Sequence, residues 1–317
     1  MTEPESAASQ AATLELHDAS FDRVGATEVA PLSLRSDARR IGLVGNWQPL
    51  FRALTNQSTL TRGSARILDS DVHVALTHGV VGFAACDPDL PASFSVFEYL
   101  EHAARLSHGS PARAKNDARR ALEEYGLSEL APRALGRLVR YQSRAIAIAC
   151  AAVTAPAVLC LETPLHDLDA ASADYIARLC AHAAERSRLI VSTALPSTPS
   201  AERALLDACD ELFVLKHGTL VAHGSPSRVF APSPRYLLTL VGAKNSDFTA
   251  ALARVGCRVT EQASPRAFNA LLAAGSRVTR YLIDLPEPAS QSLLLDAALE
   301  QGVTVLELEP IFQTLAD

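Results

Sequence analysis

Short apolar segments alternate with helical segments along most of this chain, and this alternation is what most constrains its fold. Strand, helix and strand in regular succession predict a doubly wound α/β core. Further strands are expected at residues 72–76 and 79–84. The buried strands are predicted at Ile41–Gly45, Val158–Leu161, Leu189–Ser192 and Leu212–Leu215.

Apolar residues at helical spacing mark the predicted helices, including Ser95–Leu106, Ala112–Tyr125 and Arg140–Val153. Ser95 is the expected N-cap of the first, with Glu98 completing a capping box three residues later. These helices fill much of the stretch between the strands at 79–84 and 158–161.

A second, smaller domain is predicted after a linker rich in glycine, serine and proline between residues 224 and 234. From Tyr236 the pattern starts again, with two βαβ-like passes that predict a small α+β ferredoxin-like domain over residues 236–317. Residues 1–12 are polar and small, and we expect a disordered tail there.

Composition narrows the possible partners. The net charge of −6 and the pI near 5.9 argue against a general nucleic-acid binder. No C-x-x-C spacing occurs among the cysteines, so we expect reduced, buried thiols and neither disulfides nor a metal site. The cysteines are Cys86, Cys150, Cys160, Cys180, Cys209 and Cys257.

Nothing in the sequence predicts direct membrane insertion. The first twelve residues lack the basic start and apolar stretch of a signal peptide. The longest apolar run, Ala145–Leu161, is short for a membrane span and Pro156 interrupts it. We therefore expect a cytoplasmic protein that meets a membrane only through a partner.

The segment from Leu138 to Pro164 carries the most specific pattern. It reads Leu-Val-Arg-Tyr-Gln, then a helix that stops before Pro156, then an apolar strand that ends in Glu162-Thr163-Pro164. The pair Leu168-Asp169 follows. This order resembles the ATP-binding subunit of ABC transporters, in which L-S-G-G-Q opens the helix, Asp-Glu-Pro ends the strand, and a D-loop ends in Leu-Asp.

The resemblance covers roughly residues 13 to 230. It implies a P-loop NTPase-like ABC ATPase core over residues 13–232, with a helical subdomain at about 94–142. The family's signature residues match Leu138, Val139, Arg140, Tyr141 and Gln142.

Val139 removes the signature hydroxyl, and two large side chains, Arg140 and Tyr141, replace the glycines whose backbone approaches the γ-phosphate. An arginine binds phosphate in other proteins, so Arg140 is either a new anion contact or a surface arginine. Tyr141 is expected to pack against its surroundings.

The catalytic positions that the resemblance implies are also changed. Glu162 stands where the family has the Mg²⁺-organising aspartate, and Thr163 replaces the general-base glutamate. Cys86 replaces the Q-loop glutamine and Ala194 the switch histidine. Glu162 is expected to be protonated or tied to backbone N–H groups, with residual metal binding as the alternative. For Cys86 the alternatives are a small filler and a reactive or metal-binding thiol.

The loop after Gly45 departs furthest from G-x-x-x-x-G-K-[ST]. The motif would place glycine, lysine and a hydroxyl residue at positions 50–52, where the chain has Leu50, Phe51 and Arg52. Asn46 and Trp47 begin the remnant loop. Trp47 either plugs the empty pocket or lies at a surface or interface. Phe21 is a candidate for the ring that stacks on adenine in the family, although Arg23 lies closer to the expected place.

These losses predict weak nucleotide binding at best. Each charge-assisted hydrogen bond contributes roughly 1.5–3 kcal/mol, so losing three weakens affinity by on the order of 10³- to 10⁶-fold. We expect no cofactor, or ATP and Mg²⁺ bound only weakly.

The sequence therefore predicts a pseudo-ATPase that is a structural or regulatory partner in an export-type ABC complex, beside an active ATPase subunit and a membrane permease. The export type rests on the end of the chain, Leu308–Leu315, which resembles the terminal helix of accessory domains in export-type subunits. Two alternatives stay open. One is a stand-alone adaptor with the same fold, and the other is an atypical ABC ATPase with residual ATP binding.

Overall fold

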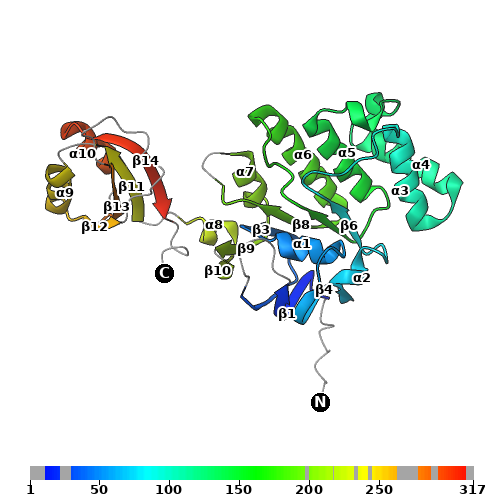
Figure 1. Ribbon diagram of the computed structural model, residues 1–317, viewed down its shortest axis with the longest axis horizontal. Coiled ribbons are helices and arrows are strands. Elements are labelled where there is room, and N and C mark those ends of the chain that lie inside the picture. Colours follow the sequence, from blue (N-terminus) through cyan, green and yellow to red (C-terminus); the bar gives the residue numbers. More distant parts are fainter. Residues whose placement is uncertain are drawn as a thin grey trace, which may run out of the picture. The chain divides into compact units, whose positions relative to one another are not determined.

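The computed structural model describes residues 11–21, 30–196, 200–216, 218–231, 235–241, 245–262, 278–286 and 292–311. Its chain divides into two units, residues 1–226 and 227–317, and each is described by itself (Figure 1).

A sheet in the order β10-β9-β3-β8-β7-β6 forms the centre of the first unit. The pairs β3–β8, β3–β9, β7–β8 and β6–β7 are parallel, and β10 is antiparallel to β9. The predicted buried strands thus lie side by side in a doubly wound α/β core. The strands are β3 (Arg40–Val44), β6 (Val81–Ala84), β7 (Val158–Leu161), β8 (Arg188–Thr193), β9 (Glu211–Lys216) and β10 (Thr219–Gly224).

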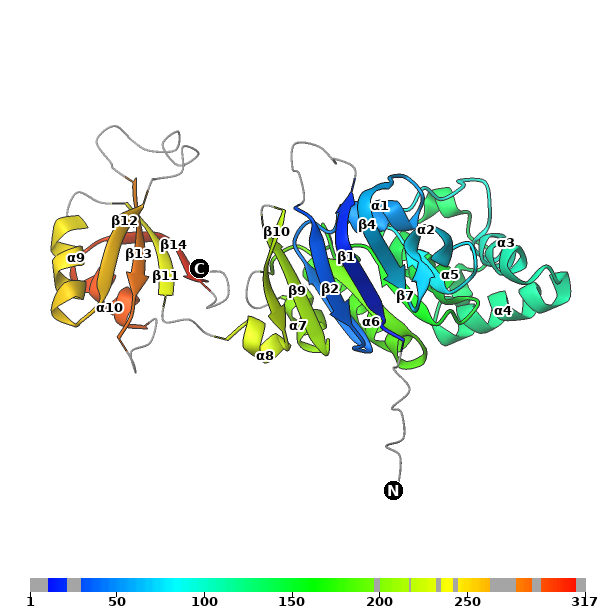
Figure 2. The same ribbon diagram turned by 90° about the horizontal axis from the view of Figure 1, so that it is seen from below.

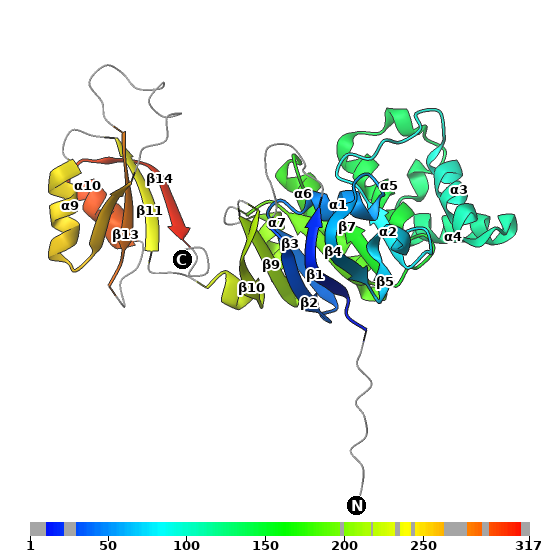
Figure 3. The same ribbon diagram turned by 60° about the horizontal axis from the view of Figure 1, so that its bottom comes forward.

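A second sheet, antiparallel and in the order β2-β1-β4-β5, packs against the central one (Figures 2 and 3). One hydrophobic cluster joins them: it contains Leu14 and Leu16 from β1, Ile41 from β3 and Phe51 from α1. Phe21 is also buried in this cluster, so its ring is not free to stack on a base. The elements are β1 (Leu14–Phe21), β2 (Leu32–Ser36), α1 (Gln48–Leu54), β4 (Leu60–Ile67) and β5 (Ser70–Asp71).

The predicted helical segment forms α3 and α4, which lie side by side at the outer edge of this unit next to α5 (Figure 1). The capping box at the start of α3 is present, since Ser95 Oγ accepts from the Glu98 N–H at 3.2 Å and the Glu98 carboxylate accepts from the Ser95 N–H at 2.8 Å. The helices are α3 (Val96–His108), α4 (Pro111–Glu124), α5 (Arg140–Ala152), α6 (Ala170–Arg186) and α7 (Ala201–Asp207), and α8 (Pro226–Val229) spans the boundary between the two units.

The strand expected at residues 72–76 is wrong, because Val72–Ala75 forms a short helix, α2. The Asp71 carboxylate accepts a hydrogen bond from the His73 N–H at 2.9 Å and caps this turn. The prediction failed because Val72, Val74 and Leu76 alternate with other residues as in a strand. A single helical turn with a capping residue can have the same apolar pattern.

The second unit has the order β11 (Arg235–Val241), α9 (Asn245–Arg254), β12 (Arg258–Gln262), β13 (Val278–Asp284), α10 (Ser292–Glu300) and β14 (Thr304–Ile311). Its antiparallel strands lie in the order β12-β13-β11-β14, which is the ferredoxin-like arrangement. Both helices pack on one face of the sheet and contribute to its core (Figure 2).

The end of the chain differs from the expected terminal helix. Residues 308–311 belong to β14, whose backbone pairs with β11, so this part is a strand. Residues 312–315 of the expected helix lie outside the described residues.

Candidate functional site

A cavity of about 750 Å³ opens at the carboxyl ends of the parallel strands of the central sheet. This edge is where α/β sheets bind ligands. The residues proposed from sequence at the ends of four different strands meet here. The cavity is lined in part by Gly45, Asn46, Trp47, Cys86, Glu162, Thr163 and Ala194.

Gly45 ends β3 in a conformation that other residues rarely adopt, with φ of +101°. A Cβ added here would lie 2.1 Å from the carbonyl oxygen of Leu215 on β9. The glycine is therefore required by a close approach of two backbones.

Most backbone N–H groups of the loop after Gly45 donate within the chain. Gly45 N–H donates to Thr193 O at 2.9 Å, Trp47 N–H to Gly45 O at 3.1 Å, and Gln48 N–H to Asn46 Oδ1 at 3.3 Å. In α1, the Leu50 and Phe51 N–H groups both donate to Trp47 O, at 3.1 and 3.4 Å. Pro49 has no N–H. The donors that would surround a phosphate are thus turned inward.

Trp47 lies under this loop. Its side chain is 2% exposed, belongs to the main hydrophobic cluster, and donates from Nε1 to Val44 O at 3.1 Å. The alternative of a surface tryptophan is wrong. The indole lines the cavity and fills space between the loop and the two sheets.

Glu162 is the first residue after β7 and is half-buried. Burial raises the pKa of its carboxyl group, while a hydrogen bond from the Cys86 backbone and the nearby Arg52 guanidinium oppose that rise. Arg52 also lines the cavity, at the position of the family's hydroxyl residue. Sequence analysis assigned no role to Arg52. In the structure, its guanidinium places a positive charge near the Glu162 carboxyl group.

Thr163 follows with φ of +38°, a strained conformation for a β-branched residue. Its N–H donates to Ser192 Oγ at 3.1 Å. Ala194, just after β8, has no side-chain polar group and is exposed in the cavity wall.

The residues that match the signature do not line this cavity. Arg140 is paired within its own chain: Nη1 donates to Asp167 O at 3.3 Å and lies 3.7 Å from the Asp167 carboxylate. Tyr141 packs edge-on against Tyr175, with ring centroids 5.9 Å apart. Val139, 53% exposed, is the N-cap of α5.

The other matched positions have structural contacts. Gln142 Oε1 accepts from the Val139 N–H at 3.3 Å. Leu138 immediately precedes that N-cap. Asp169, after Leu168, caps α6 by accepting from the Ser172 N–H at 3.0 Å, and hydrogen bonds from Ser172 hold the pKa of Asp169 below its usual range.

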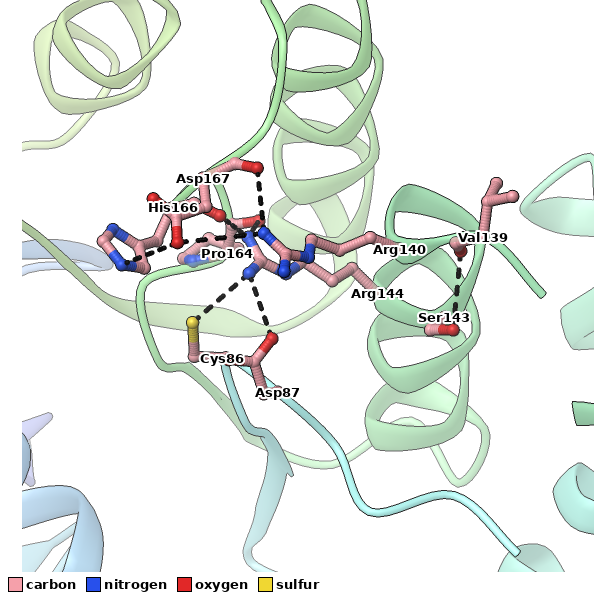
Figure 4. Close-up of polar contacts among 9 residues, drawn as sticks. All are labelled: Cys86, Asp87, Val139, Arg140, Ser143, Arg144, Pro164, His166 and Asp167. Atoms are coloured by element: carbon pink, nitrogen blue, oxygen red, sulfur yellow. Dashed lines mark hydrogen bonds and ion pairs between the residues drawn. The ribbon is translucent and has the colours of Figure 1, made fainter. Parts of the chain in front are cut away.

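Arg144, which the sequence interpretation passed over, lies beside the cavity on the second turn of α5. It joins the segments that contain Cys86 and Asp87 to the segment from Pro164 to Asp167 (Figure 4). Its place next to the long apolar run that begins at Ala145 was the available signal.

Among the described residues, no helix is both long enough and apolar enough to cross a bilayer. Within the same residues, no three His, Cys, Asp or Glu side chains gather closely enough to hold a metal ion.

Comparison with known proteins gives related but distant matches. No protein-family model matches the chain. A Fe(3+) ions import ATP-binding protein, FbpC, from Brucella melitensis is 29% identical over 160 residues, which are 48% of this chain and 44% of the relative. FbpC of Agrobacterium fabrum is 27% identical over the same length. The chain thus spans less than half the length of these curated relatives.

Solved structures match over a larger part. The protein cbiO1 of Clostridium perfringens, part of the ABC transporter complex cbiONQ, superimposes with a TM-score of 0.58 at 19% identity, covering 77% of this chain and 96% of that one. An ATP-binding subunit of an ABC transporter gives 0.57 at 17% identity, covering 68% and 91%. The chain therefore has the fold of an ABC ATPase domain and resembles, in sequence, the ATP-binding subunits of transporters.

Proposed function

We propose that this chain is a non-hydrolysing ATP-binding-cassette subunit that serves as a structural or regulatory partner in a transporter complex. The observation that carries the proposal is the loop after Gly45. Its backbone N–H groups donate to Thr193 O, Gly45 O, Asn46 Oδ1 and Trp47 O. Binding a triphosphate there in the usual way requires those bonds to break.

The same cavity has also lost groups that the family uses to bind a metal ion and to accept a proton. The Arg52 guanidinium supplies a positive charge near Glu162, where a divalent cation would otherwise be expected. Thr163 and Ala194 bring no group that accepts a proton near neutral pH. Hydrolysis of a bound nucleotide therefore lacks the base and the switch group that the family has at these two positions.

The proposed partners are a membrane permease and a catalytically active ATPase subunit. Family dimers place each nucleotide between one subunit's loop and the other's signature, and this chain has changed both. Pairing in that mode would impair both composite sites, so we propose a scaffold or regulator that leaves the active partner's own dimer intact.

The export type stays a prediction, since the curated relatives are named as import proteins. The ferredoxin-like unit is proposed to act as the accessory domain of the subunit.

Turnover and co-purification test the proposal together. The full chain, purified alone, is expected to release no phosphate from Mg-ATP above the buffer rate, and a tagged copy is expected to bring down a multi-span permease from detergent extracts. Steady turnover would favour the atypical ATPase. Recovery without a permease under several detergents would favour the stand-alone adaptor.

Matched charge reversals locate the surface that the permease uses. Arg105 on α3 and Arg119 on α4 are exposed in the outer helical segment, and Arg178 on α6 is an exposed control elsewhere. Arg105→Glu with Arg119→Glu is expected to reduce permease recovery several-fold, while Arg178→Glu leaves it unchanged. Equal recovery from both variants would argue against docking through this segment.

A further inference from the structure

Arg144 is a buried cation with contacts to two separate loops. Its side chain is 2% exposed, and its planar guanidinium offers several N–H donors. Nη1 donates to Pro164 O at 3.0 Å and to His166 O, while Nη2 lies 3.4 Å from both Cys86 Sγ and Asp87 Oδ1 (Figure 4).

The two loops leave neighbouring strands. Residues 85–87 follow β6 and lead toward α3, and residues 162–169 follow β7 and lead into α6. The planar guanidinium of an arginine can donate hydrogen bonds to acceptors on both loops at once, which a lysine ammonium does less well. One side chain of α5 thus links three parts of the unit.

A second arginine strengthens one side of this link. Arg140 lies one helical turn before Arg144, on the same face of α5, and donates to Asp167 O at 3.3 Å. The Asp167 carboxylate lies 3.7 Å from the same guanidinium nitrogen. Arg140 reaches only the loop after β7, so it provides a natural control for Arg144.

The backbone of that loop is strained at two points. Thr163 has φ of +38° and Asp167 has φ of +55°. A non-glycine residue keeps a positive φ only where contacts with the surrounding structure stabilise it. The carbonyl groups of Pro164 and His166, which accept from Arg144, lie between these two residues.

We propose that Arg144 is a clamp that holds the loops 85–87 and 162–169 together on α5, so that the cavity walls and the start of the outer helical segment form one rigid body without any ligand. The inference concerns the mechanics of the loops and does not depend on the proposed function.

Native-state hydrogen exchange of the unmodified full chain tests the clamp. The reporter amides are Cys86 in the first loop, and His166 and Leu168 in the second, whose N–H groups donate to Thr163 O at 3.1 Å and Leu165 O at 3.4 Å. At low urea concentrations, the amides of both loops are expected to exchange through one opening reaction with a common urea dependence. Separate openings with different urea dependences would overturn the proposal.

Two variants sharpen the test. Arg144→Gln is expected to accelerate exchange at least about tenfold in both loops, since each loop loses hydrogen bonds to a charged donor, and to leave the amides of β3 unchanged. Arg140→Gln is expected to accelerate exchange at His166 and Leu168 only. A change confined to one loop in Arg144→Gln would overturn the clamp. If that variant fails to fold, the unmodified chain's common opening decides the matter alone.

Discussion

At the scale of single residues, the cavity differs from a phosphate site in the direction of its donors. Gly45 keeps the backbone path that the close approach to Leu215 requires. Most of the N–H groups that follow, up to Phe51, donate to protein acceptors, and Pro49 contributes none. The loop after Gly45 thus keeps its backbone path, while most of its N–H groups donate to acceptors within the protein.

Trp47 gives a direct probe of this arrangement, because it is the only tryptophan of the chain. Trp47→Ala is expected to lower the free energy of unfolding by about 3–5 kcal/mol, since it empties a fully buried site. Trp47→Phe keeps most of the apolar volume and is expected to cost less than half as much. Urea unfolding followed by circular dichroism measures both. A cost for Trp47→Ala below about 1 kcal/mol would show that the indole is not packed as described.

Glu162 predicts a pH dependence of stability. Burial raises its pKa above the ordinary value of 4.5, so the folded state favours the protonated form. The stability that the protonated Glu162 carboxyl group contributes is fully present below its pKa in the unfolded chain. It is lost as the pH rises through the pKa of Glu162 in the folded chain. Glu162→Gln stays neutral, so its stability relative to the original chain is expected to increase as the pH rises from the unfolded pKa of Glu162 through its folded pKa.

Urea unfolding at several pH values measures this difference, and Glu129→Gln, at an exposed carboxyl group, is the control for removing a charge. A difference between Glu162→Gln and the original chain that stays constant across pH would contradict the burial of the carboxyl group.

Physical causes explain why some residues of the cavity were predicted from sequence and why Arg144 was not. Gly45, Cys86, Glu162 and Ala194 end or follow apolar strands, so parallel pairing places them at one edge. Arg144 was missed because a charged residue in a helix is ordinarily solvated. Its burial depends on carbonyl groups whose direction is set by the loop conformation.

At the scale of elements, the contact between α5 and β6 is set by a glycine. A Cβ added at Gly82 would lie 1.9 Å from the carbonyl oxygen of Ala151. This close approach places α5, and with it Arg144, against the strand that leads to Cys86.

Gly82→Ala is therefore expected to cost about 3 kcal/mol or more, because either the helix or the strand must shift. Gly79→Ala is a matched control. Its φ of +67° disfavours a side chain by about 1–2 kcal/mol, but nothing lies within 4 Å of the added Cβ. Chemical denaturation of both variants compares the costs, and an equal cost would mean that the helix is not held at Gly82.

The elements that sequence predicted best are the buried strands and the long amphipathic helices. β4, Leu60–Ile67, was not predicted because most of its residues are exposed or half-buried and show no apolar alternation. Its pairing with β1 is a long-range contact that local pattern does not encode.

At the scale of the whole molecule, two units have separate cores. Phe248 is fully buried in the core of the ferredoxin-like unit, which shares no residue with the main cluster of the first unit. Phe248→Ala is expected to destabilise its own unit by about 3–5 kcal/mol and to leave the unfolding of the first unit unchanged.

Hydrogen exchange in urea of the full chain separates the two units, with amides of β13 reporting on one and amides of β3 on the other. Equal destabilisation of both strands would mean that the two units unfold as one.

The loop after Gly45 is expected not to bind a triphosphate, and calorimetric titration of the full chain with Mg-ATP measures this. No saturable heat is expected up to millimolar nucleotide, because binding requires several existing hydrogen bonds to break. A saturable isotherm with a Kd tighter than about 100 µM would show that the loop binds nucleotide after all.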